Sequence, residues 1–247
     1  MTEPSPIRLP WIEPGDAFPS SRRALTDQHG ANGLIAASQS LTPEMLEKAY
    51  RSGIFPWSGP GEPVLWWTPN PRMVLQVDAF RCRRSLVKTI RQAVERHYEL
   101  RVDSCFQTIL TQCAAPRQGQ NGSWITPAII QNYQKLQERG LSHSLELFDG
   151  QRLLGGLYLV SIGQMLFGES MVSLEPNASK ICLAMLVQWA KAHGGQFIDC
   201  QQQTQHLQFL GAQPMDRERF EAVLTKETEK PGFPWQEHPP RLTLWGE

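Results

Sequence analysis

The fold is decided by residues 144–201, which read SLELFDGQRLLGGLYLVSIGQMLFGESMVSLEPNASKICLAMLVQWAKAHGGQFIDCQ. Three stretches of this segment are rich in aliphatic and aromatic residues and are separated by short turn sequences such as Asp149-Gly150, a pattern typical of β-hairpins. These stretches are 144–148, 153–160 and 165–173. The pattern predicts a meander of three antiparallel strands.

A helix and a further strand follow the meander. Asn177 is expected to be the N-cap of an apolar helix over 178–192, which ends at Gly194-Gly195. Residues 197–201 then read as a strand. Strands followed by a helix and another strand indicate an α+β protein.

The N-terminal part of the chain is organised differently. Thr42 and Pro43 begin a short helix that ends at Gly53, and a loop rich in aromatic residues and prolines follows. Because a turn at 69–71 separates this part from the next strand, we expect a small domain over 1–70 and a larger domain over 71–247. Further helices are expected over 80–98, 104–114 and 127–140, and strands over 64–69 and 73–77.

Composition limits the class of protein. Of 247 residues, 24 are Lys or Arg and 24 are Asp or Glu, so any nucleic-acid site must be a local patch. No apolar stretch reaches the ~18 residues of a membrane span, and the first segment lacks the apolar core of a signal peptide. We therefore expect a cytoplasmic protein without membrane contact, whose five cysteines are reduced thiols.

The helix expected over 80–98 carries its positive charges on one side. Arg81, Arg84, Lys88 and Arg91 recur at helical spacing, and apolar residues occupy another face. Such a basic face either contacts nucleic-acid phosphates or is simply solvated. The sequence by itself leaves both interpretations open.

Polar residues interrupt two of the predicted strands. Glu169 places a carboxylate in mid-strand, where burial requires a cationic partner or a hydrogen-bond network. Alternation puts Asp199 and Gln201 on one face of the last strand, roughly 6.5–7 Å apart along it. Asp199 and Gln201 can therefore bond each other and one ligand. For Glu169, the partner is either an arriving ammonium group or a structural network with a resident Arg or Lys.

Several kinds of chemistry lack their motifs. The sequence has no glycine-rich phosphate loop, dinucleotide fingerprint or G-x-S-x-G elbow. The pyrophosphate loop expected of an acyl-CoA acetyltransferase is also missing. Because the histidines lack the spacing of metal ligands, we expect no metal site.

Seven short motifs occur in one order between about residues 30 and 220. They are Asn32-Gly33-Leu34-Ile35-Ala36, the stretch AYRSGIFPW at 49–57, Leu65-Trp66-Trp67, Trp124-Ile125-Thr126, Gly168-Glu169-Ser170-Met171, Asn177-Ala178-Ser179-Lys180 and Ile198-Asp199-Cys200-Gln201. In order and spacing these motifs resemble the bacterial leucyl/phenylalanyl-tRNA-protein transferases.

The resemblance implies a small N-terminal domain and a C-terminal GNAT-like (N-acetyltransferase-like) domain with a mixed, largely antiparallel sheet. It implies an enzyme that transfers Leu or Phe, and less readily Met, from aminoacyl-tRNA to the α-amine of proteins beginning with Arg or Lys. The product carries an N-end rule degradation signal. Neither a metal nor an organic cofactor is implied, and we expect a monomer.

The resemblance also implies where the tRNA and its amino acid bind. Trp57 and Trp124 match aromatic residues around the 3′-terminal adenosine, and the basic residues Arg81, Arg84, Lys88 and Arg91 overlap a cluster for the acceptor stem. The residues that match the apolar pocket for the aminoacyl side chain are Leu157, Leu166, Met171, Leu183, Leu186 and Ile198.

Three polar residues match the family's catalytic centre. We expect Asp199 to orient Gln201, which holds the attacking amine or the donor's amino group. The carboxylate could alternatively assist deprotonation of the incoming ammonium group. Glu169 is expected to contact the donor's amino group or ribose, or to attract the basic first residue of the acceptor.

The chain departs from the family pattern at Ser38-Gln39-Ser40-Leu41, where Gly-Gly-Asp-Leu is usual. Two other interpretations stay open at this point. One is a tRNA-dependent peptidyl or peptidoglycan transferase or an acyl-CoA transferase, and the other is an RNA-binding module without catalysis. The missing CoA loop argues against acyl-CoA, and the presence of Asp199 and Gln201 argues against a module without activity.

Overall fold

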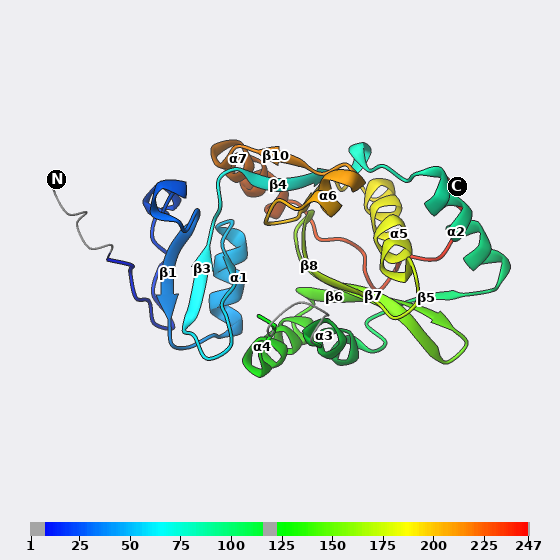
Figure 1. Ribbon diagram of the computed structural model, residues 1–247, viewed down its shortest axis with the longest axis horizontal. Coiled ribbons are helices and arrows are strands. Elements are labelled where there is room, and N and C mark those ends of the chain that lie inside the picture. Colours follow the sequence, from blue (N-terminus) through cyan, green and yellow to red (C-terminus); the bar gives the residue numbers. More distant parts are fainter. Residues whose placement is uncertain (1–7, 116–122, 247) are drawn as a thin grey trace.

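The structure of the chain, a computed structural model, describes residues 8–115 and 123–246. A small three-stranded sheet lies at one end and a seven-stranded sheet forms most of the rest (Figure 1). The described helices are α1 (Pro43–Arg51), α2 (Arg84–Glu95), α3 (Phe106–Ala114), α4 (Pro127–Glu138), α5 (Ala178–Ala192), α6 (Gln205–Leu210) and α7 (Arg217–Thr228), with 3-10 helices at Ser21–Arg23, Asp27–His29 and Val77–Ala79. The described strands are β1 (Leu34–Ser38), β2 (Phe55–Pro56), β3 (Val64–Trp67), β4 (Arg72–Gln76), β5 (Glu99–Val102), β6 (Ser142–Asp149), β7 (Arg152–Ile162), β8 (Met165–Ser173), β9 (Phe197–Asp199) and β10 (Gln213–Met215).

The large sheet has the strand order β10-β4-β9-β8-β7-β6-β5. Its centre is the predicted meander, because β6, β7 and β8 pair antiparallel in sequence order. Among the described pairs of this sheet, β8 and β9 alone run parallel, since α5 carries the chain back across the sheet between them. The predicted α+β class, with a small N-terminal domain and a mixed, largely antiparallel sheet in the C-terminal domain, is therefore confirmed.

Helices cover both faces of the large sheet. In Figure 1, α5 and α2 lie on one face, and α3 and α4 lie on the other. Because α5 is apolar around most of its circumference, eleven of its fifteen residues are buried. The C-terminal segment covers the outer side of α5, where the ring centroids of Trp189 and Trp235 are 4.3 Å apart.

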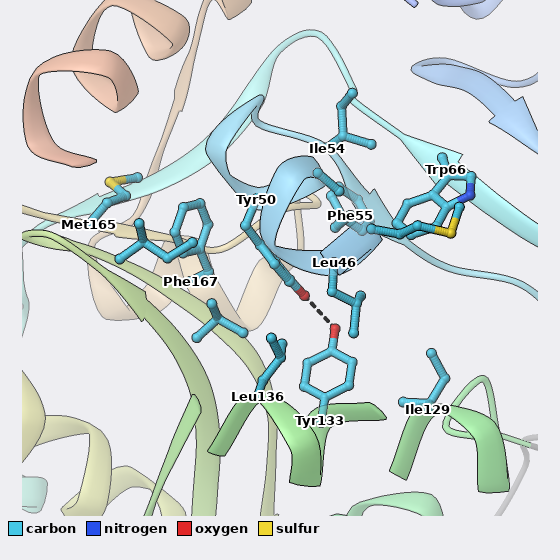
Figure 2. Packing of buried hydrophobic residues seen from close by; sticks show 14 of the residues in the cluster. Leu46, Tyr50, Ile54, Phe55, Trp66, Ile129, Tyr133, Leu136, Met165 and Phe167 are labelled. Carbon is cyan, nitrogen blue, oxygen red and sulfur yellow. Dashed lines mark hydrogen bonds between the residues drawn. The ribbon is translucent and has the colours of Figure 1, made fainter. Parts of the chain in front are cut away.

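The helix α1 joins the N-terminal domain to the large sheet. Its apolar face packs against α4, and Figure 2 shows Leu46 and Tyr50 beside Tyr133 and Leu136. The hydroxyl groups of Tyr50 and Tyr133 point toward each other and form a hydrogen bond in this buried contact. Packing of α1 on α4 thus places two polar groups inside an otherwise apolar cluster.

Helix starts were predicted from capping residues at Thr42, Thr126 and Asn177, and Thr126 Oγ1 does accept the backbone N–H of Ile129 at 3.3 Å. Thr42 behaves as predicted, because its Oγ1 accepts a hydrogen bond from the backbone N of Met45 at 3.2 Å. For α5 the predicted side-chain cap is wrong. Asn177 has a φ of 69° and forms no cap bond, whereas Ser173 Oγ accepts the backbone N–H of Ser179 at 3.0 Å. The last residue of β8 therefore caps α5.

The helix predicted over 80–98 is shorter than expected. A 3-10 turn precedes it, α2 begins only at Arg84, and the segment after it forms the edge strand β5, which the sequence interpretation missed. Residues 80–83 are held in an extended conformation, since the backbone N of Arg81 donates to the carbonyl of Leu210 at 2.8 Å. Arg81 consequently lies outside the helix.

Candidate active site

A cavity of about 380 Å³ opens between the large sheet, α5 and the segment that leads from β9 into α6. Phe55 and Trp57 of the N-terminal domain also line it, as does Trp124 from the turn before α4. Both domains therefore contribute to one cavity. Of the described residues that line it, Glu169 alone is acidic.

Most of the predicted apolar pocket residues line this cavity; they are Leu157, Met171, Leu183, Leu186 and Ile198. Of the six predicted residues, Leu166 does not line it. Leu166 is 1% exposed and pairs with Ile198 in the parallel ladder. Because it lies five residues from Met171, the two side chains are on the order of 15 Å apart along β8. Leu166 packs in the core at the far end of the strand.

A β-bulge in β8 places Glu169. Its neighbours Gly168 and Ser170 pair with consecutive residues of β7, so the ladder skips Glu169. An extra residue reverses the alternation of side chains beyond it. The bulge thus lets Met171 share a face with Leu166 while the carboxylate of Glu169 reaches the edge of the cavity.

Three side chains hold the Glu169 carboxylate. Its Oε1 accepts hydrogen bonds from the Tyr50 hydroxyl at 2.7 Å and from Gln201 Nε2 at 2.8 Å. Its Oε2 accepts a hydrogen bond from the Tyr133 hydroxyl at 3.0 Å. Tyr50 and Tyr133 are themselves buried with their hydroxyl oxygens close together, so the network fixes both carboxylate oxygens.

The surroundings of Glu169 change its titration. Burial raises the pKa of Glu169 to about 7, against the lowering effect of the hydrogen bonds from Tyr50 and Tyr133. Burial and the nearby Glu169 charge also raise the pKa of both tyrosines well above the usual value, which keeps their hydroxyls protonated as donors. Glu169 is thus a carboxyl group that gains or loses its proton near neutral pH.

Asp199 lies behind the cavity rather than in its wall. It is fully buried and bound to Arg72, whose Nε and Nη2 donate to the two carboxylate oxygens at 2.8 and 2.7 Å. The guanidinium lies between the rings of Phe55 and Phe220, at 4.6 and 4.8 Å from their centroids. A resident cation, Arg72, therefore neutralises Asp199. The sequence interpretation considered such a cation for Glu169 and not for Asp199.

Gln201 follows the last strand instead of belonging to it. β9 ends at Asp199, and Gln201 adopts a left-handed backbone with a φ of 60°. The predicted shared strand face for Asp199 and Gln201 is wrong, because this turn redirects the chain. Asp199 Oδ1 accepts the backbone N–H of Gln201 at 2.8 Å, and the Gln201 side chain is left to reach Glu169.

The two predicted tryptophans lie at the rim of the cavity. Trp57 is 42% exposed, and its ring meets Trp67 edge to face with 5.7 Å between centroids. Trp67 Nε1 donates to the carbonyl of Trp57 at 2.6 Å, which fixes the loop that carries it. Trp124 is half-buried against the core.

The predicted basic residues lie outside the cavity. Arg84, Lys88 and Arg91 are exposed on α2, and Arg81 is exposed just before it. The described ranges contain no group of three or more His, Cys, Asp or Glu residues that could hold a metal ion. Within the same ranges, no helix combines the length and apolarity needed to cross a membrane.

Sequence reasoning missed the three residues that hold the carboxylates. Tyr50 was part of a quoted motif, but nothing local showed that its hydroxyl would meet Glu169, 119 positions away. Tyr133 and Arg72 gave no local signal either. A buried tyrosine or arginine requires a hydrogen-bond partner, and that rule is the only signal that pointed toward such contacts.

Two known protein families and several named relatives match this chain. A family described as "Leucyl/phenylalanyl-tRNA protein transferase" matches residues 74–225, and the corresponding N-terminal domain family matches residues 39–70. A leucyl/phenylalanyl-tRNA–protein transferase of Burkholderia multivorans is 47% identical over 230 residues, which cover 92% of this chain and 91% of that protein. A protein of the same name from Paraburkholderia phytofirmans is 47% identical over 231 residues, covering 92% and 94%.

One solved structure, titled "The structure of L-PGS from Bacillus licheniformis", aligns with a TM-score of 0.38 and 12% identity, covering 70% of this chain and 53% of that one. The sequence matches are far stronger than this likeness. They make the chain an enzyme of the aminoacyltransferase class, with aminoacyl-tRNA and a protein as its substrates. The chain belongs to the leucyl/phenylalanyl-tRNA–protein transferase family. Membership favours this activity over the acyl-CoA and RNA-binding alternatives.

Proposed function

We propose that this chain transfers Leu or Phe, and less readily Met, from aminoacyl-tRNA to the α-amine of proteins that begin with Arg or Lys. The reaction takes place in the cytoplasm and creates an N-end rule degradation signal. The apolar wall of the cavity suits the binding of a Leu or Phe side chain. Because these residues do not branch at Cβ, they fit a pocket in which Val or Ile would clash.

The observation that carries the proposal is a single acidic group at the edge of an apolar cavity. Among the described residues, no Lys or Arg forms a salt bridge with Glu169, and its hydrogen-bond donors are neutral. An anionic Glu169 therefore has a place for a cation that the protein itself does not supply. An ammonium group of the donor or the acceptor, or a basic first side chain, meets this need.

The chemistry is aminolysis of an ester that is already activated. The acceptor's α-ammonium first loses one proton, and its nitrogen lone pair attacks the ester carbonyl carbon of the donor. As the peptide bond forms, the bond to the ribose oxygen breaks, that oxygen takes one proton, and one proton is released overall. Alignment of two substrates in a cavity from which water is excluded accounts for much of the acceleration.

Each polar residue has a role in this alignment. Gln201 holds the attacking amine or the donor's amino group, while Glu169 contacts the donor's amino group or ribose, or attracts the basic first residue of the acceptor. Asp199 acts through the Gln201 backbone, since Arg72 already occupies its carboxylate. We therefore set aside the alternative in which Asp199 itself takes a proton from the ammonium group.

The tRNA end is proposed to bind at the rim of the cavity. Trp57 and Trp124 stack on the 3′-terminal adenosine, a contact worth ~1–3 kcal/mol per base. The exposed residues before and on α2, Arg81, Arg84, Lys88 and Arg91, contact the acceptor stem. We also propose a domain boundary near residue 70, which is supported by the change of sheet between β3 and β4, and a monomeric enzyme.

Transfer of radiolabelled leucine from charged tRNA tests the proposal. The acceptors are three otherwise identical proteins that begin with Arg, Lys or Met, and isoleucyl-tRNA is the matched β-branched donor. We expect label on the Arg and Lys proteins only, and little transfer of Ile. Equal labelling of the Met protein would overturn the acceptor rule, and efficient transfer of Ile would overturn the shape argument for the pocket.

A further inference from the structure

An exposed aromatic residue and an arginine form a pair beside the cavity. Phe209 lies near the end of α6 and is 49% exposed. The guanidinium carbon of Arg83 lies 3.9 Å from the centroid of its ring. A phenylalanine that remains half exposed while a cation covers one face of its ring offers a flat, partly apolar surface to solvent.

This pair lies between the cavity and the basic helix. Its neighbours on α6, His206, Leu207 and Leu210, line the cavity, whereas Arg83 is the residue that immediately precedes α2. The hydrogen bond from Arg81 N to the carbonyl of Leu210 fixes the two segments against each other. A chain leaving the cavity toward α2 therefore passes the edge that carries the pair.

The electrostatics of this edge favour a polyanion. Arg81, Arg83, Arg84, Lys88 and Arg91 are all exposed, and the described residues provide no carboxylate within salt-bridge distance of any of them. Elsewhere on the surface, Arg51, Arg101, Arg139 and Arg152 do have such partners. In a protein whose net charge is zero, unpaired basic residues beside an exposed ring resemble a single-strand binding surface.

We propose that Phe209 and Arg83 form a stacking site for an unpaired nucleotide of the tRNA 3′ end, next to the terminal adenosine. This rests on the proposed function, because it requires the terminal adenosine to lie at the cavity rim. A base stacks on Phe209, and Arg83 contacts the adjoining phosphate or the edge of the base. The site reads no sequence, since every base offers a flat face. It would fix the direction in which the acceptor end leaves the cavity.

Binding of an RNA minihelix tests this site independently of transfer. One minihelix carries the unpaired 3′ end, and a second lacks those unpaired nucleotides. Phe209→Leu removes the ring but keeps an apolar side chain, and Phe209→Trp keeps a ring. We expect Phe209→Leu to weaken binding of the intact minihelix about tenfold and to leave the trimmed one unchanged, while Phe209→Trp binds at least as well as the wild type.

Three results would overturn the site: unchanged binding in Phe209→Leu, an equal loss for both minihelices, or a loss in Phe209→Trp as large as in Phe209→Leu. Since Phe209 is half exposed, thermal melting of each variant is expected to match the wild type. Arg83→Gln is expected to make the slope of log affinity against log salt shallower by about one for the intact minihelix. Failure of the proposed function appears separately, as wild-type protein that binds the minihelix but transfers no leucine.

Discussion

Arg72 and Asp199 form a bidentate ion pair that is closed off from solvent, with 1% and 0% of the two residues exposed. The pair joins the first residue of β4 to the last residue of β9, and Asp199 in turn accepts the backbone N–H of Gln201. The left-handed turn that aims the Gln201 side chain at Glu169 is therefore anchored by a buried arginine. Through Asp199, Arg72 thus holds the turn at the edge of the candidate active site.

Removal of either member of the pair should destabilise the protein strongly. Arg72→Met or Asp199→Asn leaves one buried charge without its partner, which costs about 3–5 kcal/mol of unfolding free energy. The double variant should lose less than the sum of the two singles, because it buries no unpaired charge. Urea unfolding of the three variants measures this coupling. Additive losses would show that the pair does not act as a unit.

The same variants should affect transfer. Asp199→Asn is expected to lower kcat for leucine transfer more than it changes KM for charged tRNA, because the contacts proposed for the tRNA, at Trp57, Trp124 and the basic residues of α2, do not involve Asp199. Gln201→Ala should have a similar effect. If the folded Asp199→Asn protein had the kcat of the wild type, the proposed positioning role of Asp199 would be contradicted.

Local patterns were enough to predict the meander, the capped start of α1 and the apolar character of α5. In each case the signal is carried by residues within one or two turns of chain, as with Thr42 and Pro43. The same local reasoning predicted a helix that begins too early, at residue 80. Arg81 is instead held in an extended segment, because its backbone N–H donates to the carbonyl of Leu210. The helical spacing of apolar and charged residues cannot show that a carbonyl from a distant segment will bind this backbone N–H.

The candidate site was predicted residue by residue only where the family motifs supplied it. The partners that decide its electrostatics are remote, as the 127 positions between Arg72 and Asp199 show. The bulge at Glu169 was also missed, since strict alternation cannot reveal an extra residue in a strand. Sequence thus located the candidate functional groups, and tertiary structure determined which of them line the cavity.

Glu169 should make stability depend on pH. Its pKa is raised from 4.5 to about 7 in the folded protein, so the folded state binds more protons than the unfolded state between these values. Unfolding free energy should therefore fall as pH rises from about 4.5 to 7, by on the order of 3 kcal/mol relative to Glu169→Gln. Urea unfolding of both proteins at several pH values measures the difference. Parallel pH curves would contradict the raised pKa.

The tyrosines should tune this titration. Because the proposed function uses the anionic form of Glu169, transfer should rise with pH as Glu169 loses its proton. The hydrogen bond from Tyr50 lowers the pKa of Glu169, so Tyr50→Phe should move this rise to a higher pH. Tyr158→Phe is the matched control, because Tyr158 is also buried but its hydroxyl has no partner among the described residues. That control should leave the pH profile unchanged. Equal shifts in both variants would indicate a packing effect instead.

The basic face of α2 should contribute to tRNA binding through charge alone. Lys88→Ala should weaken binding at low salt, and the difference from wild type should shrink as salt increases, because the variant neutralises about one phosphate fewer and releases fewer counterions. Lys226→Ala on α7 removes another exposed lysine and serves as the control. The measurement is a salt titration of tRNA affinity. The same weakening in both variants would argue for a nonspecific effect of net charge.

Two leucines that differ in their relation to the cavity should separate specificity from stability. Leu183 lines the cavity, whereas Leu166 is buried outside it. Either leucine changed to Ala should cost about 2–5 kcal/mol of unfolding free energy through the space left behind. Leu183→Ala should also raise transfer of Phe relative to Leu by several-fold, because the enlarged pocket favours the larger side chain. Leu166→Ala should leave this ratio near the wild-type value. Competition between phenylalanyl- and leucyl-tRNA in one reaction measures the ratio directly. If the ratio changed only in Leu166→Ala, the aminoacyl side chain would bind near Leu166 in the core and not in the cavity.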